Sequence, residues 1–223
     1  LKDKEGFSLA NLKINDIWQP DLKNEALLVY GTTDTKHPGV DYLLNIGNNN
    51  YVSGSLEKIS LPRHYDFLDL RHSPNDLKSQ FKARDWDKII AFQTRNPMHK
   101  AHYELTKKAM LEIGANLLIH PVVGMSKPGD IDQYTRTRCY QHILDEYPND
   151  SALISLLPLA MRMGGPREAV LHAIIRKNYG CTHLIVGRDH AGPGVDSNGN
   201  AFYGPYEAHN LLSNFQDEIG IEI

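Results

Sequence analysis

The sequence has few cysteines, no long hydrophobic run and little net charge, and each shortage excludes a class of protein. Two cysteines among 223 residues are too few for a disulfide-rich secreted scaffold or an all-cysteine zinc site. No apolar run approaches the roughly 20 residues that cross a bilayer. The net charge of −3 gives no bulk attraction to nucleic acid or to an anionic membrane. We therefore expect neither partner, and any anion site must be built locally.

The chain also lacks a recognisable start. It begins with Leu1, its first residues do not form a signal peptide, and it ends at Ile223 in a pattern typical of the middle of a strand. We therefore expect a fragment of a longer protein. Cys139 and Cys181 fit a reducing compartment, so we expect a cytoplasmic location. A folded chain of this mass would bury roughly 70% of its surface, which is enough for a core.

The first 65 residues differ from the rest in composition. They are rich in Asn, Asp, Gly and Pro, and short apolar runs such as residues 26–30 alternate with turn signals. This pattern predicts a small mixed or β-rich unit. Residues 73–76 then resemble a helix start, and a short helix is expected over 77–84.

From Asp87 onward, short apolar runs alternate with helical patterns. Strands are predicted over residues 88–92, 117–119, 152–157 and 183–186, and helices over 98–113, 133–147 and 166–179. This alternation predicts the α/β class, with parallel βαβ units and a sheet covered on both faces. Such sheets bind ligands beyond the carboxyl ends of their strands. We therefore expect the chemistry in the loops after Phe92, His120, Leu157 and Val186.

The loop after the first of these strands carries anion-binding side chains and leads into a helix. The N-terminus of a helix offers free N–H groups and partial positive charge. His99 and His102 are three residues apart and so share one helical face. Arg95 adds a guanidinium fork suited to phosphate or sulfate, and Gln93 and Asn96 add neutral donors.

The loop after the last strand is a second candidate. It reads Gly-Arg-Asp-His-Ala-Gly-Pro-Gly over residues 187–194 and brings Arg188, His190 and glycines that let a ligand approach the backbone. Both loops are expected at the same edge of the sheet, and together they hold two arginines and three histidines. We interpret them as one local anion site.

Simpler interpretations of these residues stay open. The histidine pair would bind zinc with a third ligand from His120, His183 or His190, although two nearby arginines disfavour a cation. Arg188 and Asp189 would form only an ion pair at a strand end.

Three further segments are ambiguous. Lys127, in residues 125–130, and Arg162, in residues 161–165, would reach phosphates from loops after the second and third strands, but solvated turns explain them as well. Residues 134–138 are expected to form a basic helix face. Ser155 lacks a nucleophile-elbow pattern, so an acyl-transfer triad is unsupported.

At both loops the chain resembles the ATP sulfurylase (sulfate adenylyltransferase) family. Residues 93–102, Gln-Thr-Arg-Asn-Pro-Met-His-Lys-Ala-His, are similar to its Gln-x-Arg-Asn-x-x-His-x-x-His signature. Residues 187–192 are similar to its Gly-Arg-Asp-His-Ala-Gly signature, and further similar stretches extend the resemblance over nearly the whole chain.

The resemblance implies a domain organisation. Residues 1–65 would be the end of a β-rich, PUA-like N-terminal domain. Residues 66–223 would be a Rossmann-like nucleotidyltransferase domain with a parallel sheet, truncated at its C-terminus. A homo-oligomer is expected as well.

The resemblance also implies residue roles. Thr94, Arg95 and Asn96 would be active-site residues, and His99 and His102 would stabilise the transition state. The residues that would contact ATP are Gln93, Thr94, Arg95, Asn96, Gly187, Arg188, Asp189 and His190. The sulfate site would be lined by Gln93, Arg95 and Ala191.

The implied reaction joins ATP and sulfate to give adenylyl sulfate and diphosphate. Mg²⁺ would arrive with ATP, and no tightly bound metal or organic cofactor is expected. Three rival functions remain open. They are another adenylyl- or cytidylyltransferase with the same histidine pair, a nucleotide-binding module without turnover and, more distantly, a zinc-binding structural module.

Overall fold

The structure, a computed structural model, describes residues 1–3, 5–124, 131–148 and 150–223. It divides into two compact units. One comprises Leu1–Leu68 with Gly194–Asn200, and the other comprises Asp69–Pro193 with Ala201–Ile223. The loop around Lys127, a candidate phosphate contact, lies outside the described residues.

The smaller unit mixes strands and helices. Its elements are β1 (Asn11–Trp18), α1 (Leu22–Tyr30), α2 (Pro38–Asp41), the π-helix η1 (Tyr42–Ile46) and β2 (Tyr51–Glu57). The two strands pair antiparallel, and Ala26, Tyr30 and Val40 form a small core between the helices. The second segment of this unit is tied in through Asp34, whose carboxylate accepts hydrogen bonds from the N–H and hydroxyl of Ser197, both at 2.8 Å.

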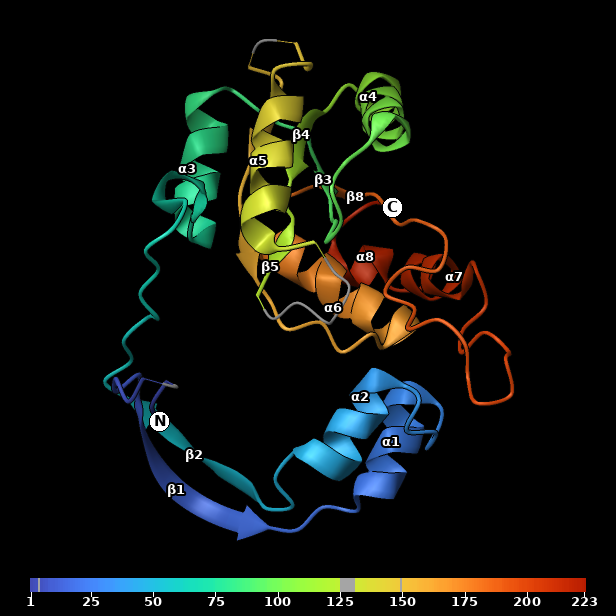
Figure 1. The fold of residues 1–223 in the computed structure, drawn as a ribbon. Helices are drawn as coiled ribbons and strands as arrows, with labels where there is room; N and C mark the ends of the chain where they lie inside the picture. Colours follow the sequence, from blue (N-terminus) through green and yellow to red (C-terminus); the bar gives the residue numbers. More distant parts are fainter. Residues whose placement is uncertain (4, 125–130, 149) are drawn as a thin grey trace. The chain divides into compact units, whose positions relative to one another are not determined.

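The larger unit contains the predicted alternation of strands and helices (Figure 1). After the 3₁₀ turn η2 (Leu68–Leu70), its helices are α3 (Pro74–Ala83), α4 (Lys100–Ile113), α5 (Gln133–Leu144), α6 (Gly165–Asn178), α7 (Glu207–Ser213) and α8 (Gln216–Ile219). Its strands are β3 (Ile89–Phe92), β4 (Asn116–Ile119), β5 (Val122–Val123), β6 (Ala152–Ile154), β7 (Leu157–Pro158) and β8 (His183–Leu184).

Four of these strands form one parallel sheet in the order β6-β4-β3-β8. The order means that the chain builds outward from β3 through β4 to β6 and then returns to the other side of β3. This reversal is the strand order of a Rossmann-type sheet, whose ligand crevice opens beside the strand where the order reverses. The predicted α/β fold with a parallel sheet is confirmed, and the crevice is expected between β3 and β8.

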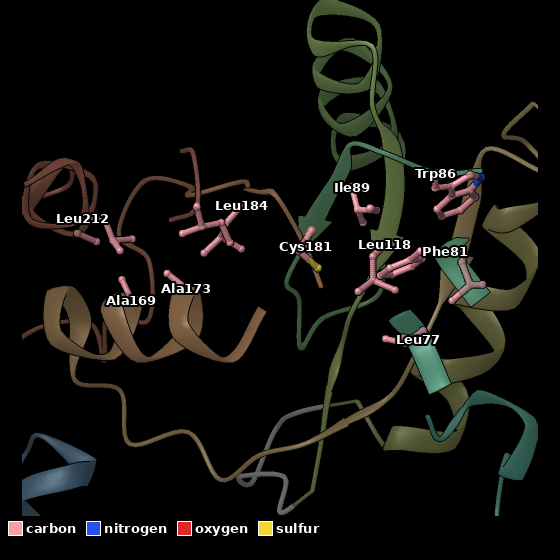
Figure 2. Close-up of a cluster of buried hydrophobic side chains, with 14 residues drawn as sticks. Leu77, Phe81, Trp86, Ile89, Leu118, Ala169, Ala173, Cys181, Leu184 and Leu212 are labelled. Carbon is pink, nitrogen blue, oxygen red and sulfur yellow. The ribbon is translucent and has the colours of Figure 1, made fainter. Parts of the chain in front are cut away.

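Helices cover both faces of this sheet. On one face, Ile89 and Ala91 of β3 pack with Leu118 of β4 against side chains of α3, α6 and α7 (Figure 2). Phe92 points to the other face, since side chains alternate along a strand, and its ring centroid lies 5.6 Å from that of His102 in α4. All four residues of β3 are buried, which explains why the strand reads as a continuous apolar run.

Local signals set the helix boundaries. Ser73 caps α3 reciprocally with Asp76: the Asp76 N–H donates to Ser73 Oγ at 3.3 Å, and the Ser73 N–H donates to Asp76 Oδ2 at 2.8 Å. Gly114 ends α4 in the left-handed conformation, with φ of 66°. The second predicted helix stops at Leu144 rather than at residue 147, because the residue before Pro148 is disfavoured in a helix.

The predicted strand over residues 152–157 is wrong in one respect. The strand β6 ends at Ile154, and Leu157 begins β7, which pairs with β5 in a separate two-stranded parallel sheet. Between them, the Leu156 N–H donates to the carbonyl oxygen of Leu70 at 2.8 Å, outside the main sheet. A continuous apolar run cannot show this change of partner. The last predicted strand is also shorter and ends at Leu184.

No helix in the described part of the chain is both long enough and apolar enough to cross a membrane.

Candidate functional site

A cavity of about 460 Å³ opens at the carboxyl ends of β3 and β8. It lies where the strand order reverses, as the topology leads one to expect. The loops after both strands line it. Its lining comprises Phe92, Gln93, Thr94, Arg95, Asn96, His102, Leu105, Met161, Met163, Ile185, Gly187, Arg188, Asp189, His190, Ala191 and Gly192. Of the residues to which the two signature motifs assign a role, His99 alone is absent from that lining.

The loop after β3 is held in shape by its own side chain and by α5. Thr94 Oγ1 donates to the carbonyl oxygen of Asn96 at 2.9 Å and accepts from the Asn96 N–H at 3.1 Å. The hydroxyl of Tyr140 donates to the same carbonyl at 2.8 Å. Nη1 of Arg136 donates to the carbonyl oxygen of Arg95. These contacts fix the backbone, and the side chains of Arg95 and Asn96 remain available to a ligand in the cavity.

The role of α5 corrects one sequence expectation. A basic helix face is expected over residues 134–138, and Arg138 is exposed there, but Arg136 is only 4% exposed. Tyr140, one turn further on, is only 1% exposed. Arg136 and Tyr140 lie four positions apart, so both side chains leave the same face of the helix and reach the same loop. Sequence reasoning missed both as supports of the site. Their i, i+4 spacing was a weak signal, because it does not show which face is buried.

His99 and His102 lie at the start of α4 with their ring centroids 4.0 Å apart. The N–H of His99 donates a long hydrogen bond, 3.4 Å, to Nδ1 of His102. This bond places the imidazole proton of His102 on Nε2. Burial and the neighbouring His99 lower the pKa of His102, so its ring is neutral at pH 7. His102 can therefore serve as an N–H donor at the cavity.

The loop after β8 has an unusual backbone. Asp189 and Ala191 adopt positive φ angles of 51° and 56°. The Asp189 carboxylate lies against Gly192, where an added Cβ would be 1.8 Å from Oδ1, so an alanine there would displace the Asp189 side chain. The guanidinium carbon of Arg188 lies 5.6 Å from the ring centroid of Tyr206, and this cation–π contact orients Arg188.

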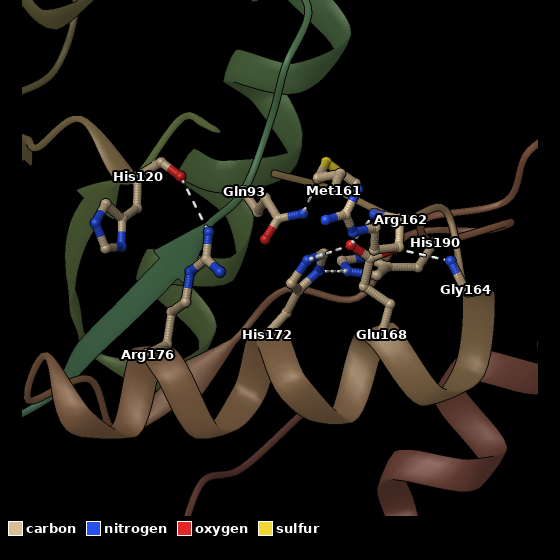
Figure 3. A network of polar contacts seen from close by, with 9 residues as sticks. All are labelled: Gln93, His120, Met161, Arg162, Gly164, Glu168, His172, Arg176 and His190. Carbon is tan, nitrogen blue, oxygen red and sulfur yellow. Dashed lines mark hydrogen bonds and ion pairs between the residues drawn. The ribbon is translucent and has the colours of Figure 1, made fainter. Parts of the chain in front are cut away.

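A polar network lies under this loop on α6 (Figure 3). The carboxylate of Glu168 accepts hydrogen bonds from the N–H groups of Arg162 and Gly164 at 2.9 and 2.8 Å. One helical turn further, Nδ1 of His172 lies 3.0 Å from Nε2 of His190. The network joins α6 to the turn that carries Met161 and Met163 and to the loop after β8. Neither α6 residue belongs to a sequence motif, so the sequence pattern alone did not point to them.

Arg162 faces a second, smaller cavity. It lines a space of about 100 Å³ together with Arg95, Arg136 and Met161. Arg95 and Met161 line both cavities, so the two spaces adjoin at Arg95. The loop after the third strand therefore lies at the same edge of the sheet as the candidate site.

Two of the histidines considered as a third zinc ligand, His120 and His183, have other neighbours in the structure. His120 is fully buried, its ring 4.7 Å from Tyr179, and its carbonyl oxygen accepts from Arg176 Nη2 at 3.2 Å. His183 lies 3.2 Å from the Glu222 carboxylate. Within the described ranges, no three His, Cys, Asp or Glu side chains gather to hold a metal.

The sheet and the cavity define an α/β protein of Rossmann type, with basic and imidazole side chains at the switch point. Comparison with known families narrows the class. Residues 68–223 match the ATP-sulfurylase family, and residues 1–61 match the PUA-like domain family. The chain belongs to the ATP-sulfurylase family.

Individual relatives agree. The chain is 56% identical over 215 residues to the sulfate adenylyltransferase of Schizosaccharomyces pombe, covering 96% of this chain and 44% of that protein. It is 55% identical to the sulfate adenylyltransferase of Saccharomyces cerevisiae, covering 96% of this chain and 42% of that protein. It thus spans less than half the length of these relatives. A solved structure described as the hexameric APS kinase from Thiobacillus denitrificans superposes with a TM-score of 0.70 at 30% identity, over 99% of this chain and 36% of that one.

Proposed function

We propose that this chain carries the nucleotide and sulfate site of a sulfate adenylyltransferase, which converts ATP and sulfate into adenylyl sulfate and diphosphate. One observation carries the proposal: the two signature loops, about 90 residues apart in the sequence, line one cavity at the switch point of the sheet. The names of the relatives support the same reaction.

The cavity gives each signature residue a role within this proposal. Gln93, Arg95 and Ala191 hold sulfate, with the Arg95 guanidinium supplying the charge. ATP contacts residues 93–96 and 187–190. Thr94 shapes the loop through its hydrogen bonds with the backbone of Asn96, and the Asn96 side chain contacts ATP. His102, assisted by His99, donates to phosphoryl oxygens as charge develops on them.

The chemistry needs positioning more than acid–base groups. Sulfate is already ionised, so no general base is required for its attack on the α-phosphorus. In-line alignment of sulfate, the α-phosphorus and the departing diphosphate supplies much of the rate. Donors fixed by the protein stabilise the developing charge. Mg²⁺ enters with ATP as part of the substrate, because phosphate oxygens supply most of its ligands.

The proposal extends to the organisation of the protein. Residues 1–65 are the PUA-like part and residues 66–223 the catalytic part, with further catalytic-domain sequence in the longer protein. A homo-oligomer is supported by the hexamer named for the structural neighbour. A cytoplasmic location is consistent with the two free cysteines.

The test is formation of ATP from adenylyl sulfate, diphosphate and Mg²⁺ by the 223-residue chain and by the longer protein. ATP formation is expected, with its loss in Arg95→Ala and its retention in Arg138→Ala, an exposed arginine on α5. Turnover of another acid in place of sulfate, or adenylyl sulfate binding without turnover in the longer protein, would contradict the proposal.

A further inference from the structure

Two buried residues of α6 lie behind the candidate site. Glu168 is 6% exposed and His172 is fully buried. They are four residues apart, so both side chains leave the same face of the helix. Oε1 of Glu168 lies 3.6 Å from Nε2 of His172, while the other ring nitrogen of His172 lies 3.0 Å from Nε2 of His190 (Figure 3). The 3.6 Å step is longer than a hydrogen bond, and Nε2 of His172 has no hydrogen-bond partner among the described residues, so the Glu168 carboxylate is a nearby charge rather than a bonded acceptor.

The direction of the hydrogen bond between His172 and His190 follows from the charge of Glu168. Two backbone N–H groups donate to its carboxylate, and these bonds together with His172 keep the pKa of Glu168 low despite its burial. An ionised carboxylate beside Nε2 of His172 favours the proton on that nitrogen. Nδ1 of His172 is then an acceptor, and Nε2 of His190 must be the donor.

Both imidazoles are neutral in this arrangement. Burial lowers the pKa of His172, and burial together with His172 and Arg176 lowers the pKa of His190 to about 3. The cation of Arg176, one turn beyond His172 on α6, opposes a second positive charge on either ring. A neutral His190 with its proton on Nε2 leaves a lone pair on Nδ1.

We propose that Glu168 and His172 are positioning residues that hold His190 with its proton on Nε2, so that Nδ1 of His190 meets the nucleotide as a hydrogen-bond acceptor. The proposal rests on the proposed function, which places a nucleotide in this cavity. The partner of His190 is an N–H or O–H group of the nucleoside, either the adenine amino group or a ribose hydroxyl. Phosphate oxygens, which are acceptors, do not pair with it.

This assignment gives the cavity two imidazoles of opposite polarity. His102 presents an N–H donor, since its Nδ1 accepts from the backbone of His99. His190 presents an acceptor, since its Nε2–H is used by His172. A nucleotide has acceptors at its phosphates and donors at its nucleoside. The two rings therefore distinguish its two ends and favour one orientation in the cavity.

The first test reads the tautomer of His190 directly. Nitrogen-15 NMR of the imidazole rings, recorded on the ligand-free chain, is expected to show a protonated Nε2 and an unprotonated Nδ1 for His190 at pH 7. In His172→Leu the two tautomers should exchange, whereas His172→Asn keeps an acceptor near the former Nδ1 and should preserve the wild-type signal. Exposed His142 serves as the internal control. A proton on Nδ1 of wild-type His190 overturns the proposal even if neither variant folds.

The second test uses ATP and three analogues: 2′-deoxy-ATP, 3′-deoxy-ATP and the triphosphate of purine riboside, which lacks the amino group. One analogue should bind the wild-type chain about tenfold more weakly than ATP, as loss of one hydrogen bond predicts. The His172→Leu variant should bind that analogue and ATP equally well. The control variant Leu171→Ala, at an exposed neighbouring position on α6, should discriminate between them as the wild type does. Equal binding of all four nucleotides to the wild type overturns the proposal.

The two tests separate this proposal from the proposed function. The tautomer is measured without ligand and does not depend on turnover. A chain that binds the nucleotides as expected but forms no ATP contradicts the function alone. A chain that forms ATP with a proton on Nδ1 of His190 contradicts the positioning role alone.

Discussion

The hydroxyl of Tyr140 donates a 2.8 Å hydrogen bond to the carbonyl oxygen of Asn96, 44 positions earlier in the chain. A buried residue of α5 thereby holds the backbone of the loop after β3 from behind. The same carbonyl accepts from Thr94, and the preceding one accepts from Arg136. The shape of the loop is therefore a property of α5 as much as of its own sequence.

Tyr140→Phe tests this support. Removing the hydroxyl deletes one buried hydrogen bond and leaves the ring in place, so the free energy of unfolding should fall by about 1 kcal/mol. The loop should also loosen and weaken nucleotide binding severalfold. Urea denaturation and titration calorimetry measure the two effects. Tyr134→Phe, half-exposed on the same helix, is the matched control. An unchanged stability and affinity in Tyr140→Phe would remove the supporting role.

Gly192→Ala tests the loop after β8. Its Cβ would stand 1.8 Å from Oδ1 of Asp189, so the carboxylate or the backbone must move. Because Asp189 lines the cavity and its exposed side chain can rotate away, we expect nucleotide affinity to drop about tenfold and the free energy of unfolding to fall by up to about 1 kcal/mol. For Gly187→Ala, no described atom lies within 4 Å of the added Cβ, so its unfolding free energy should stay close to wild type. Equal stabilities of the two variants would count against the constraint.

The histidine pair should contribute unequally. His102 lines the cavity, whereas His99 is exposed and packs its ring against His102 at a tilt of 38°. His102→Ala should lower the rate of ATP formation about 10²-fold, the usual cost of one fixed donor to a developing oxyanion. His99→Ala should lower it less, because it removes an orienting neighbour. Steady-state kinetics with His142→Ala as control separate them, and a larger loss in His99→Ala would reverse the assignment.

Acid should destabilise the larger unit before its carboxylates titrate. Burial lowers the pKa of His190 to about 3 and lowers those of His172 and His120. The unfolded chain therefore binds their protons first, and the stability they confer is complete above pH 6.5 and is lost as the pH falls. His190 alone should cost about 2 kcal/mol between pH 7 and pH 5.

Urea denaturation at these two pH values measures this loss. His190→Asn should reduce the difference between them, and His142→Asn should not. Glu168 should contribute little to the loss of stability between pH 7 and pH 5. Its pKa is lowered, so its carboxylate stays ionised over this range and loses its stabilising charge only in more acidic solution. Equal stability at pH 7 and pH 5 would contradict the neutral state of the buried imidazoles.

The sequence predicted the elements that depend on local pattern. The run Lys88 to Phe92 and the Pro- and Gly-flanked helix over residues 166–179 match β3 and α6 closely, because burial on both faces and helix-end signals are local properties. The two signature loops were also predicted at one edge of the sheet. Parallel strands make that edge common to all loops that follow them.

The features that the sequence did not predict depend on contacts between residues far apart in the chain. Nothing around Ser155 indicates that the chain leaves one sheet and joins another. The burial of Arg136 and Tyr140 follows from the loop packed against them, and the role of Glu168 follows from the turn of Arg162 and Gly164. Arg136 and Tyr140 act through contacts with residues more than 40 positions away. Glu168 acts through backbone N–H groups, which almost every residue has, so the sequence pattern does not mark any of the three.

The pairing of β3 with β8 also sets when the cavity can form. Ile89 and Thr182 are joined by hydrogen bonds across 93 positions of the chain. Closing a loop of that length costs entropy before any contact rewards it, and parallel pairings of high sequence separation are slow to form. By this argument we expect the cavity to be among the last features to appear during folding, so that nucleotide binding during refolding would report completion of the sheet.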